Sequence, residues 1–112
     1  MHELSIALTI IDRVQTEMSR RPGDSLKTVG LRIGALSAVD PEALAFSFTA
    51  ASRSTPVEGA RLNIEWVPAS ILCHSCGHSS RADQLRFVCT KCGSTDIDVQ
   101  SGYELDITYL EV

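Results

Sequence analysis

The sequence predicts an α+β fold: a small α/β-type layer of two helices on a mixed three-stranded sheet, with an inserted subdomain that carries every cysteine. Three observations support this prediction. Apolar residues recur at helical spacing near the start, three later segments alternate apolar and polar residues, and two Cys-x2-Cys pairs stand before the last of those segments. The 112 residues suffice for one modest core and a small appendage.

Composition and charge exclude several classes of protein. Apolar residues make up 44% and charged residues 21%, which is a globular balance. The net charge of -4 gives no general attraction to nucleic acid or to an anionic membrane. The first apolar run is broken by Asp12 and Arg13 and has no basic region before it, so we expect no signal peptide, no membrane span and a cytoplasmic location.

The first helix is predicted from the spacing of its apolar residues. They recur at three- and four-residue steps with polar residues between them, which is typical of an amphipathic helix. Pro22 and Gly23 end the pattern. The apolar stripe consists of Leu4, Ala7, Leu8, Ile11, Val14 and Met18.

A second helix is predicted over about residues 41–51. Asp40 is suited to the N-cap, and Pro41 to the first helical position, where its missing N–H costs nothing. Glu42 complements the positive end of the helix dipole. We expect this helix to pack Leu44, Phe46 and Phe48 into the core.

Three strands are predicted from alternation, over residues 27–34, 61–67 and within 103–112. Residues 70–100 are too few and too polar to form a core beside the last strand, so we expect it to return and pair with the first two. The main domain is then discontinuous, residues 1–69 and 100–112, and residues 70–99 form the inserted subdomain. The apolar faces are expected to be Val29, Leu31 and Ile33; Leu62, Ile64 and Trp66; and Tyr103, Leu105, Ile107 and Tyr109.

The inserted subdomain contains Cys73, Cys76, Cys89 and Cys92, with a glycine directly after each pair. A Cys-x2-Cys-Gly turn directs both sulfurs inward, and two such turns supply four thiolates at tetrahedral positions, which suits Zn²⁺ in a closed structural site. Four protein ligands leave no open position for catalysis. An iron(Cys)4 electron carrier and four free buried thiols are the alternatives.

The other residues of this zinc-ribbon subdomain indicate no further chemistry. His74 and His78 are most simply exposed turn residues, with an extra zinc ligand or a pH-sensitive neighbour as the alternative. Neither has an evident partner for a catalytic dyad, and the chain lacks a phosphate-binding G-x-x-x-x-G-K-[ST] loop, so we expect no enzymatic activity. Its cations and anions balance and form no basic face: Arg81, Arg86 and Lys91 against Asp83, Asp96 and Asp98.

The first three residues form an outline of a chelator. The Met1 amine, the His2 amide and the His2 imidazole can surround one ion, and Glu3 or its amide is a natural fourth donor. Planar nitrogen-rich coordination is favoured by Ni²⁺ and Cu²⁺. We expect this group to precede the first helical turn. The alternative is that His2 is incidental and Glu3 only complements the helix dipole.

In combination, the opening MHEL, the segment LRIGALSAVDPEALAFSF and the paired Cys-x2-Cys-Gly turns resemble the HypA/HybF family of hydrogenase maturation nickel metallochaperones. The resemblance implies a nickel site at Met1, His2 and Glu3 and a structural zinc site at the cysteines. It also implies a GTPase partner, HypB, and delivery of nickel to the large subunit of [NiFe]-hydrogenase. Relatives vary between the first two cysteines, so His74 inherits no role.

Two classes of function therefore remain open. The first is a nickel delivery protein, and the second is a zinc-ribbon protein–protein adaptor without a second metal. Exposed edges of a three-stranded sheet permit pairing, so a monomer or a weak homodimer is expected. Asp40 is interpreted as a helix cap, with an accessory nickel contact as the alternative.

Overall fold

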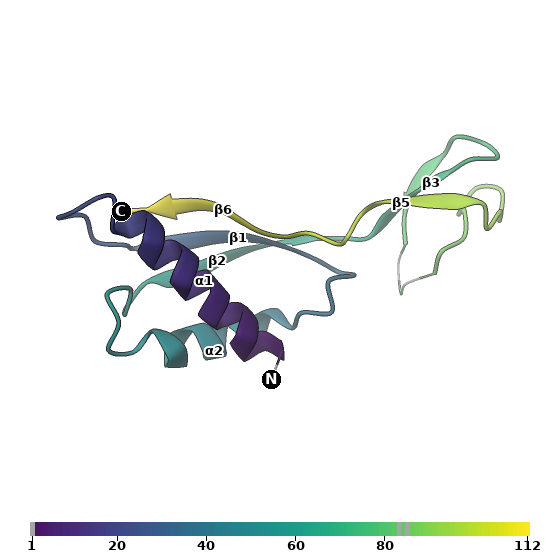
Figure 1. Cartoon of the computed structure of the whole chain (residues 1–112). Helices are drawn as coiled ribbons and strands as arrows, with labels where there is room; N and C mark the ends of the chain where they lie inside the picture. Colours follow the sequence, from purple (N-terminus) through teal and green to yellow (C-terminus); the bar gives the residue numbers. More distant parts are fainter. Residues whose placement is uncertain (1, 83, 85) are drawn as a thin grey trace. The chain divides into compact units, whose positions relative to one another are not determined.

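The structure, a computed structural model, describes residues 2–82, 84 and 86–112 (Figure 1). Neither helix in this part of the chain combines the length and the apolarity that crossing a membrane requires. The elements follow in the order α1 (His2–Met18), β1 (Thr28–Gly34), α2 (Pro41–Ser52), β2 (Arg61–Val67), β3 (Ser70–Cys73), β4 (Ser79–Arg81), β5 (Ile97–Ser101) and β6 (Leu105–Glu111).

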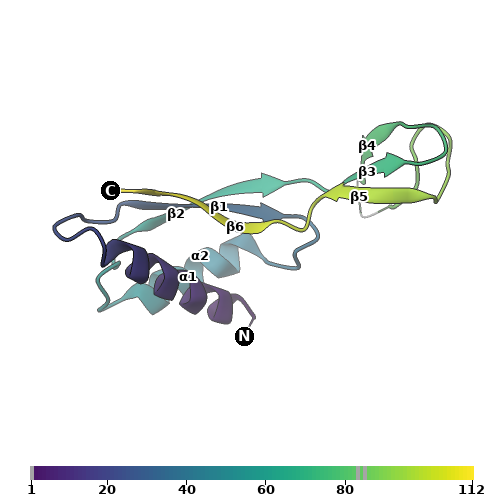
Figure 2. The ribbon, with the colours of Figure 1, turned by 45° about the horizontal axis from the view of Figure 1, so that its top comes forward.

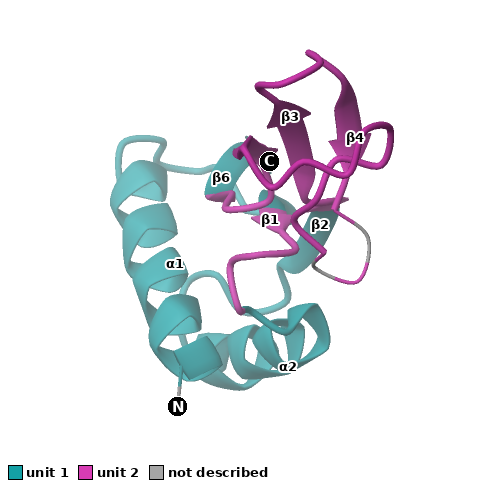
Figure 3. Cartoon of the chain, turned by 90° about the vertical axis from the view of Figure 1, so that its right-hand side faces the viewer, with its two compact units in different colours: residues 1–32, 39–65, 106–112 teal, residues 33–38, 66–105 magenta. Residues whose placement is uncertain are grey.

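The chain divides into two compact units, shown in teal and magenta in Figure 3. Unit 1 comprises residues 1–32, 39–65 and 106–112, and unit 2 comprises residues 33–38 and 66–105. The expected insertion, residues 70–99, falls within unit 2, which is longer at both ends and includes a segment from early in the chain. Both units are therefore discontinuous in sequence.

The first sheet has the strand order β2-β1-β6. At one end of the β1–β2 pair, the N–H of Arg61 donates to the carbonyl of Lys27 (2.9 Å). Further along, the N–H of Ala35 donates to the carbonyl of Val67 (2.9 Å). Residue numbers rise in the same direction along both strands, so β1 and β2 are parallel.

Strand β6 runs the other way. The N–H of Lys27 donates to the carbonyl of Glu111 (2.7 Å), and the N–H of Gly34 donates to that of Glu104 (2.8 Å). Here the numbers rise on one strand while they fall on the other, which makes the pair antiparallel. The mixed three-stranded sheet is confirmed, and so is the return of the last strand after the cysteine segment.

The core of unit 1 lies between its two helices and one face of this sheet; both helices lie on the same side in Figures 1 and 2. Leu44 and Phe48, one helical turn apart, are buried as expected. The expected burial of Phe46 is wrong, because it lies about 200° around the helix from Leu44 and is 76% exposed. The other large contributors are Ile10, Ile11, Val14, Val29 and Leu31.

Tyr109 lies on the face of the sheet opposite the helices. A Cβ on Gly30 would come within 2.0 Å of its ring, so only glycine leaves room for the ring at that position. Its hydroxyl accepts a hydrogen bond from Nδ2 of Asn63 (2.6 Å), which bridges the outer strands over the middle one. The aromatic ring thus covers the centre strand instead of entering the core.

Unit 2 contains the second sheet, in the order β4-β3-β5, with both pairs antiparallel. Its small apolar cluster is formed by Ala69, Ile71 and Ala82, with Ile97 and Val99 packed against it. Strand β3 ends at Cys73, which lies opposite Ile97 of β5. The sheet therefore delivers the first cysteine directly from a hydrogen-bonded strand.

Candidate metal centre

The two Cys-x2-Cys-Gly segments fold into the same turn. In the first, the N–H of Gly77 donates to the carbonyl of Cys73, and the N–H of Cys73 donates to that of His78, both at 2.9 Å. The second turn repeats both bonds at the same offsets and the same 2.9 Å: Gly93 to Cys89, and Cys89 to Ser94.

The glycines are required by backbone conformation. Gly77 has φ 76° and Gly93 has φ 75°, in the left-handed region that other residues rarely adopt. An added Cβ would meet nothing within 4 Å at either position. Glycine is therefore needed for the backbone angle and not for space, as the sequence predicted.

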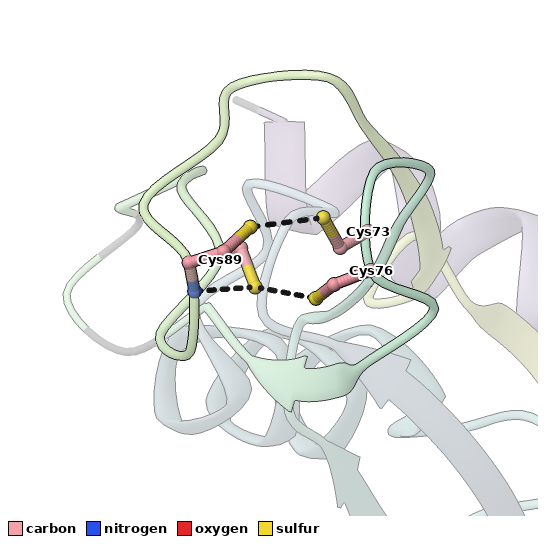
Figure 4. Close-up of side chains that lie close together, drawn as sticks. Cys73, Cys76 and Cys89 are labelled. Carbon is pink, nitrogen blue, oxygen red and sulfur yellow. Dashed lines mark hydrogen bonds between the residues drawn. The ribbon is translucent and has the colours of Figure 1, made fainter.

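The four sulfur atoms converge from the two turns. Cys73 and Cys76 project from one turn towards Cys89 on the facing turn (Figure 4). All four Sγ atoms lie within 4.8 Å of one another, and none is in a disulfide. Across the turns, the Sγ atoms of Cys73 and Cys92 are 3.6 Å apart, and those of Cys76 and Cys89 are also 3.6 Å apart. Zinc–sulfur bonds of about 2.3 Å require sulfur separations of roughly 3.8 Å in a tetrahedron, so the donor set fits zinc.

Backbone donors favour the thiolate form of the first cysteine in each pair. The N–H groups of Cys92 and Lys91 both lie 3.4 Å from Sγ of Cys89, and donation from Cys92 first and Lys91 second lowers the pKa of Cys89 to about 6. Donation from the backbone of Cys76 likewise lowers the pKa of Cys73. Both turns are thus prepared to bind a cation.

Cys92 is the cysteine whose thiolate form depends most on a bound cation. A backbone hydrogen bond from Ser94 lowers its pKa, but the sulfur of Cys73, desolvation and the sulfurs of Cys89 and Cys76 outweigh that effect and raise it to about 12. A divalent ion among the four sulfurs favours the thiolate outright. The chemistry of the donor set therefore agrees with its geometry.

His74 has a partner that sequence reasoning missed. Its Nε2 lies 2.6 Å from Oδ2 of Asp98, and its Nδ1 lies 3.7 Å from Oδ1 of Asp96. The hydrogen bond with Asp98, aided by the charges of both carboxylates, raises the pKa of His74. The His74 side chain is 45% exposed, as expected. Asp98 is 24 residues away in the sequence, so only the pairing of β3 with β5 reveals the contact.

At the N-terminus, Met1 lies outside the described residues. Helix α1 begins at His2, so the expectation that the chelating group precedes the first helical turn is wrong for His2 and Glu3. Their amides nonetheless lie in the first turn, where no intrahelical acceptor exists. His2 is exposed, and Oε2 of Glu3 accepts a hydrogen bond from the N–H of Asp40 (3.4 Å).

Among the residues that the structure describes, the cysteines are the one group of three or more His, Cys, Asp or Glu side chains placed to share an ion. The structure therefore brings together the predicted zinc ligands. His2 and Glu3 are adjacent at the start of α1, and His78 is half-buried away from any side-chain partner in this part of the chain.

This chain is similar along its full length to one family of known proteins. A family model described as "Hydrogenase/urease nickel incorporation, metallochaperone, hypA" matches residues 1–112. The hydrogenase maturation factor HypA of Desulfatibacillum aliphaticivorans is 37% identical over 113 residues, covering 100% of this chain and 87% of that protein. That of Acidithiobacillus ferrooxidans is 42% identical over 113 residues, covering 100% and 99%.

Two solved structures share the fold. A solution structure of HypA protein is 25% identical, with a TM-score of 0.71, and covers 99% of this chain and 95% of its own. A solution structure of the Ni metallochaperone HypA from Helicobacter pylori is 24% identical, with a TM-score of 0.65, and covers 97% and 95%.

Proposed function

Because this chain belongs to the HypA family of nickel metallochaperones, we propose that it binds Ni²⁺ at its N-terminus and, with the GTPase HypB, delivers the ion to the large subunit of [NiFe]-hydrogenase. The membership confirms the family resemblance deduced from the sequence. It also makes the chain a hydrogenase maturation factor and not an enzyme. The nickel ligands, the zinc ion with its ligands, and the partners are proposals.

The nickel site consists of the Met1 amine, the amide and imidazole of His2, and Glu3 or its amide. One observation carries this assignment: α1 begins at His2, so the amide nitrogens that would bind the ion take no part in the i→i−4 ladder. Ni²⁺ favours planar nitrogen donors. The contact of Glu3 with the N–H of Asp40 supports a fixed side-chain position beside α2.

The zinc site consists of Cys73, Cys76, Cys89 and Cys92. A bound Zn²⁺ joins the two turns as a structural cross-link. Four sulfurs complete the tetrahedron, which leaves no position for cargo. We therefore assign nickel to the domain of residues 1–69 and 100–112, and structural zinc to residues 70–99.

Delivery requires a site that exchanges its ion. His2 is exposed at the end of a helix, so a partner can replace its donors one at a time. A closed site of four sulfurs, two of them on buried cysteines, would release the ion too slowly for transfer. The exposed N-terminal site suits nickel cargo for this reason, and the sulfur site suits a resident ion.

The experiment compares His2→Ala with the parent chain, both made with an unextended N-terminus, by calorimetric titration with Ni²⁺. The variant is expected to lose nickel binding while it keeps one zinc per chain and the same helical content. His78→Ala is the matched control, because it removes a second histidine far along the chain, and it should retain nickel. Unchanged nickel affinity in His2→Ala would reject the site.

Stoichiometry separates this function from that of a zinc-only adaptor. After exposure to Ni²⁺ and removal of excess ion, metal analysis should find one nickel beside one zinc per chain. Zinc alone would contradict nickel binding and favour the adaptor.

A further inference from the structure

A second set of contacts, outside the sulfur atoms, joins the two cysteine turns. We propose that His74 and Ser75 are positioning residues of the metal centre, which fasten the first turn to residues 94–98 and slow the loss of the bound ion. This proposal rests on the zinc site of the proposed function and concerns residues to which the family resemblance gives no role.

His74 makes three contacts with residues 96–98, where β5 begins. Its backbone N–H donates to the carbonyl of Asp96 (2.9 Å), and its ring nitrogens lie 2.6 Å from Oδ2 of Asp98 and 3.7 Å from Oδ1 of Asp96. It directly follows Cys73, which pairs with Ile97. The backbone bond thus extends the β3–β5 ladder by one position into the metal-binding turn, and the side-chain contacts reinforce it.

Ser75 makes the second link. Its hydroxyl lies 3.1 Å from the hydroxyl of Ser94. Ser94 belongs to the second turn, since its carbonyl accepts from the N–H of Cys89 (2.9 Å), and its hydroxyl accepts from the N–H of Asp96 (3.1 Å). The two turns are therefore connected through protein atoms alone.

The contacts of His74 and Ser75 hold the two cysteine turns at the separation that places four sulfurs around one ion. Each turn supplies two of the four sulfurs, so an ion leaves only when the turns separate or a sulfur swings away. Contacts that hold the turns together oppose the first route and keep the sulfurs near tetrahedral positions. Loss of comparable partners around metal ligands typically weakens metal affinity by about 10–100-fold.

The test measures the rate at which the zinc-loaded full chain releases zinc to an excess of chromogenic chelator. His74→Ala should release zinc about 10-fold faster than the parent chain. Asp98→Ala should do the same, and the double variant should be no faster than either single variant, because both remove one shared contact. Ser75→Ala should also accelerate release.

Two variants distinguish a positioning role of His74 from a general loss of structure in the subdomain. His74→Gln should restore slow release, since its amide can donate to Asp98 from nearly the place of Nε2. Gln100→Ala is the matched control, because Gln100 lies on β5, is exposed and has no side-chain partner in the described part of the chain; its release rate should equal that of the parent.

Cobalt substitution gives a readout that a purely structural role would not move. The absorption bands of Co²⁺ bound to four sulfurs should broaden and shift in His74→Ala and recover in His74→Gln. A parental release rate in His74→Ala, or additive effects of His74→Ala and Asp98→Ala, would overturn the proposal. Nickel binding through His2 is measured separately, so its failure would leave this result standing.

Discussion

At the scale of single residues, the metal-binding turns depend on backbone conformation as much as on sulfur. Gly77 and Gly93 hold nearly equal positive φ values and close nearly identical hydrogen-bonded turns. These turns direct N–H groups at the cysteine sulfurs, which lowers the pKa of Cys89 and Cys73. A change that leaves every ligand in place can therefore still weaken the site.

Gly77→Ala tests this dependence. Alanine in the left-handed region costs about 1–2 kcal/mol, so the zinc-loaded variant should lose about that free energy of unfolding and release zinc faster. Denaturant titration and chelator competition measure the two effects. Asn tolerates positive φ better than Ala, so Gly77→Asn should retain more stability; equal losses in both variants would contradict the conformational explanation.

The proposed nickel ligands give a prediction for the pH dependence of nickel binding. Binding displaces protons from the amine, the imidazole and the His2 amide, so nickel affinity should fall steeply between neutral and mildly acidic buffer. Calorimetry in buffers of different ionisation enthalpy will count the released protons. Affinity that does not change with pH would exclude ligation by these nitrogens.

At the scale of the elements, the start of α2 is specified locally and also contacts the start of α1. Oδ1 of Asp40 accepts from the N–H of Glu42 (3.0 Å) and of Ala43 (3.5 Å), as predicted for an N-cap. The backbone N–H of Asp40 donates to Glu3 (3.4 Å). One residue thus caps α2 and contacts a residue assigned to nickel.

Asp40→Ala should therefore lower the free energy of unfolding by about 1 kcal/mol through the lost cap. Asp40→Asn keeps a capping oxygen and the backbone N–H, so thermal denaturation should find it close to the parent chain. The Asn variant should also keep nickel affinity in calorimetry. A marked loss there would instead make the Asp40 carboxylate an accessory nickel ligand.

At the scale of the whole molecule, the two units differ in how they are stabilised. Unit 1 buries large side chains from both helices and the sheet, among them Leu44, Phe48 and Leu31. The apolar cluster around the second sheet has two alanines and one isoleucine at its centre: Ala69, Ile71 and Ala82. We expect so small a cluster to depend on a metal cross-link between its turns.

Removal of zinc by a strong chelator should therefore disorder unit 2 and spare unit 1. In NMR spectra, the amide signals of Ile71 and Val99 should shift or broaden, while those of Leu31 and Leu44 persist. Far-UV circular dichroism should keep its helical signal, because both helices belong to unit 1. Simultaneous loss of the helical signal would show that the metal is needed for the whole fold.

Features that depend on neighbouring residues could be predicted from the sequence. The apolar period of α1, the cap and proline of α2, and the glycine-closed cysteine turns each occupy a short stretch, where periodicity and backbone preference act directly. The family resemblance came from the same stretches, and the four cysteines that were expected to form one group do lie together.

Contacts between residues far apart in the sequence could not be predicted and are seen only in the folded chain. The partnership of His74 with Asp98 and the contact of Glu3 with Asp40 join residues 24 and 37 positions apart. The ring of Tyr109 lies over Gly30, on the face of the sheet away from the helices, although the alternation assigned it to the apolar face of its strand. Such contacts depend on strand order and register, which arise from packing of the whole chain and leave no mark in any single segment.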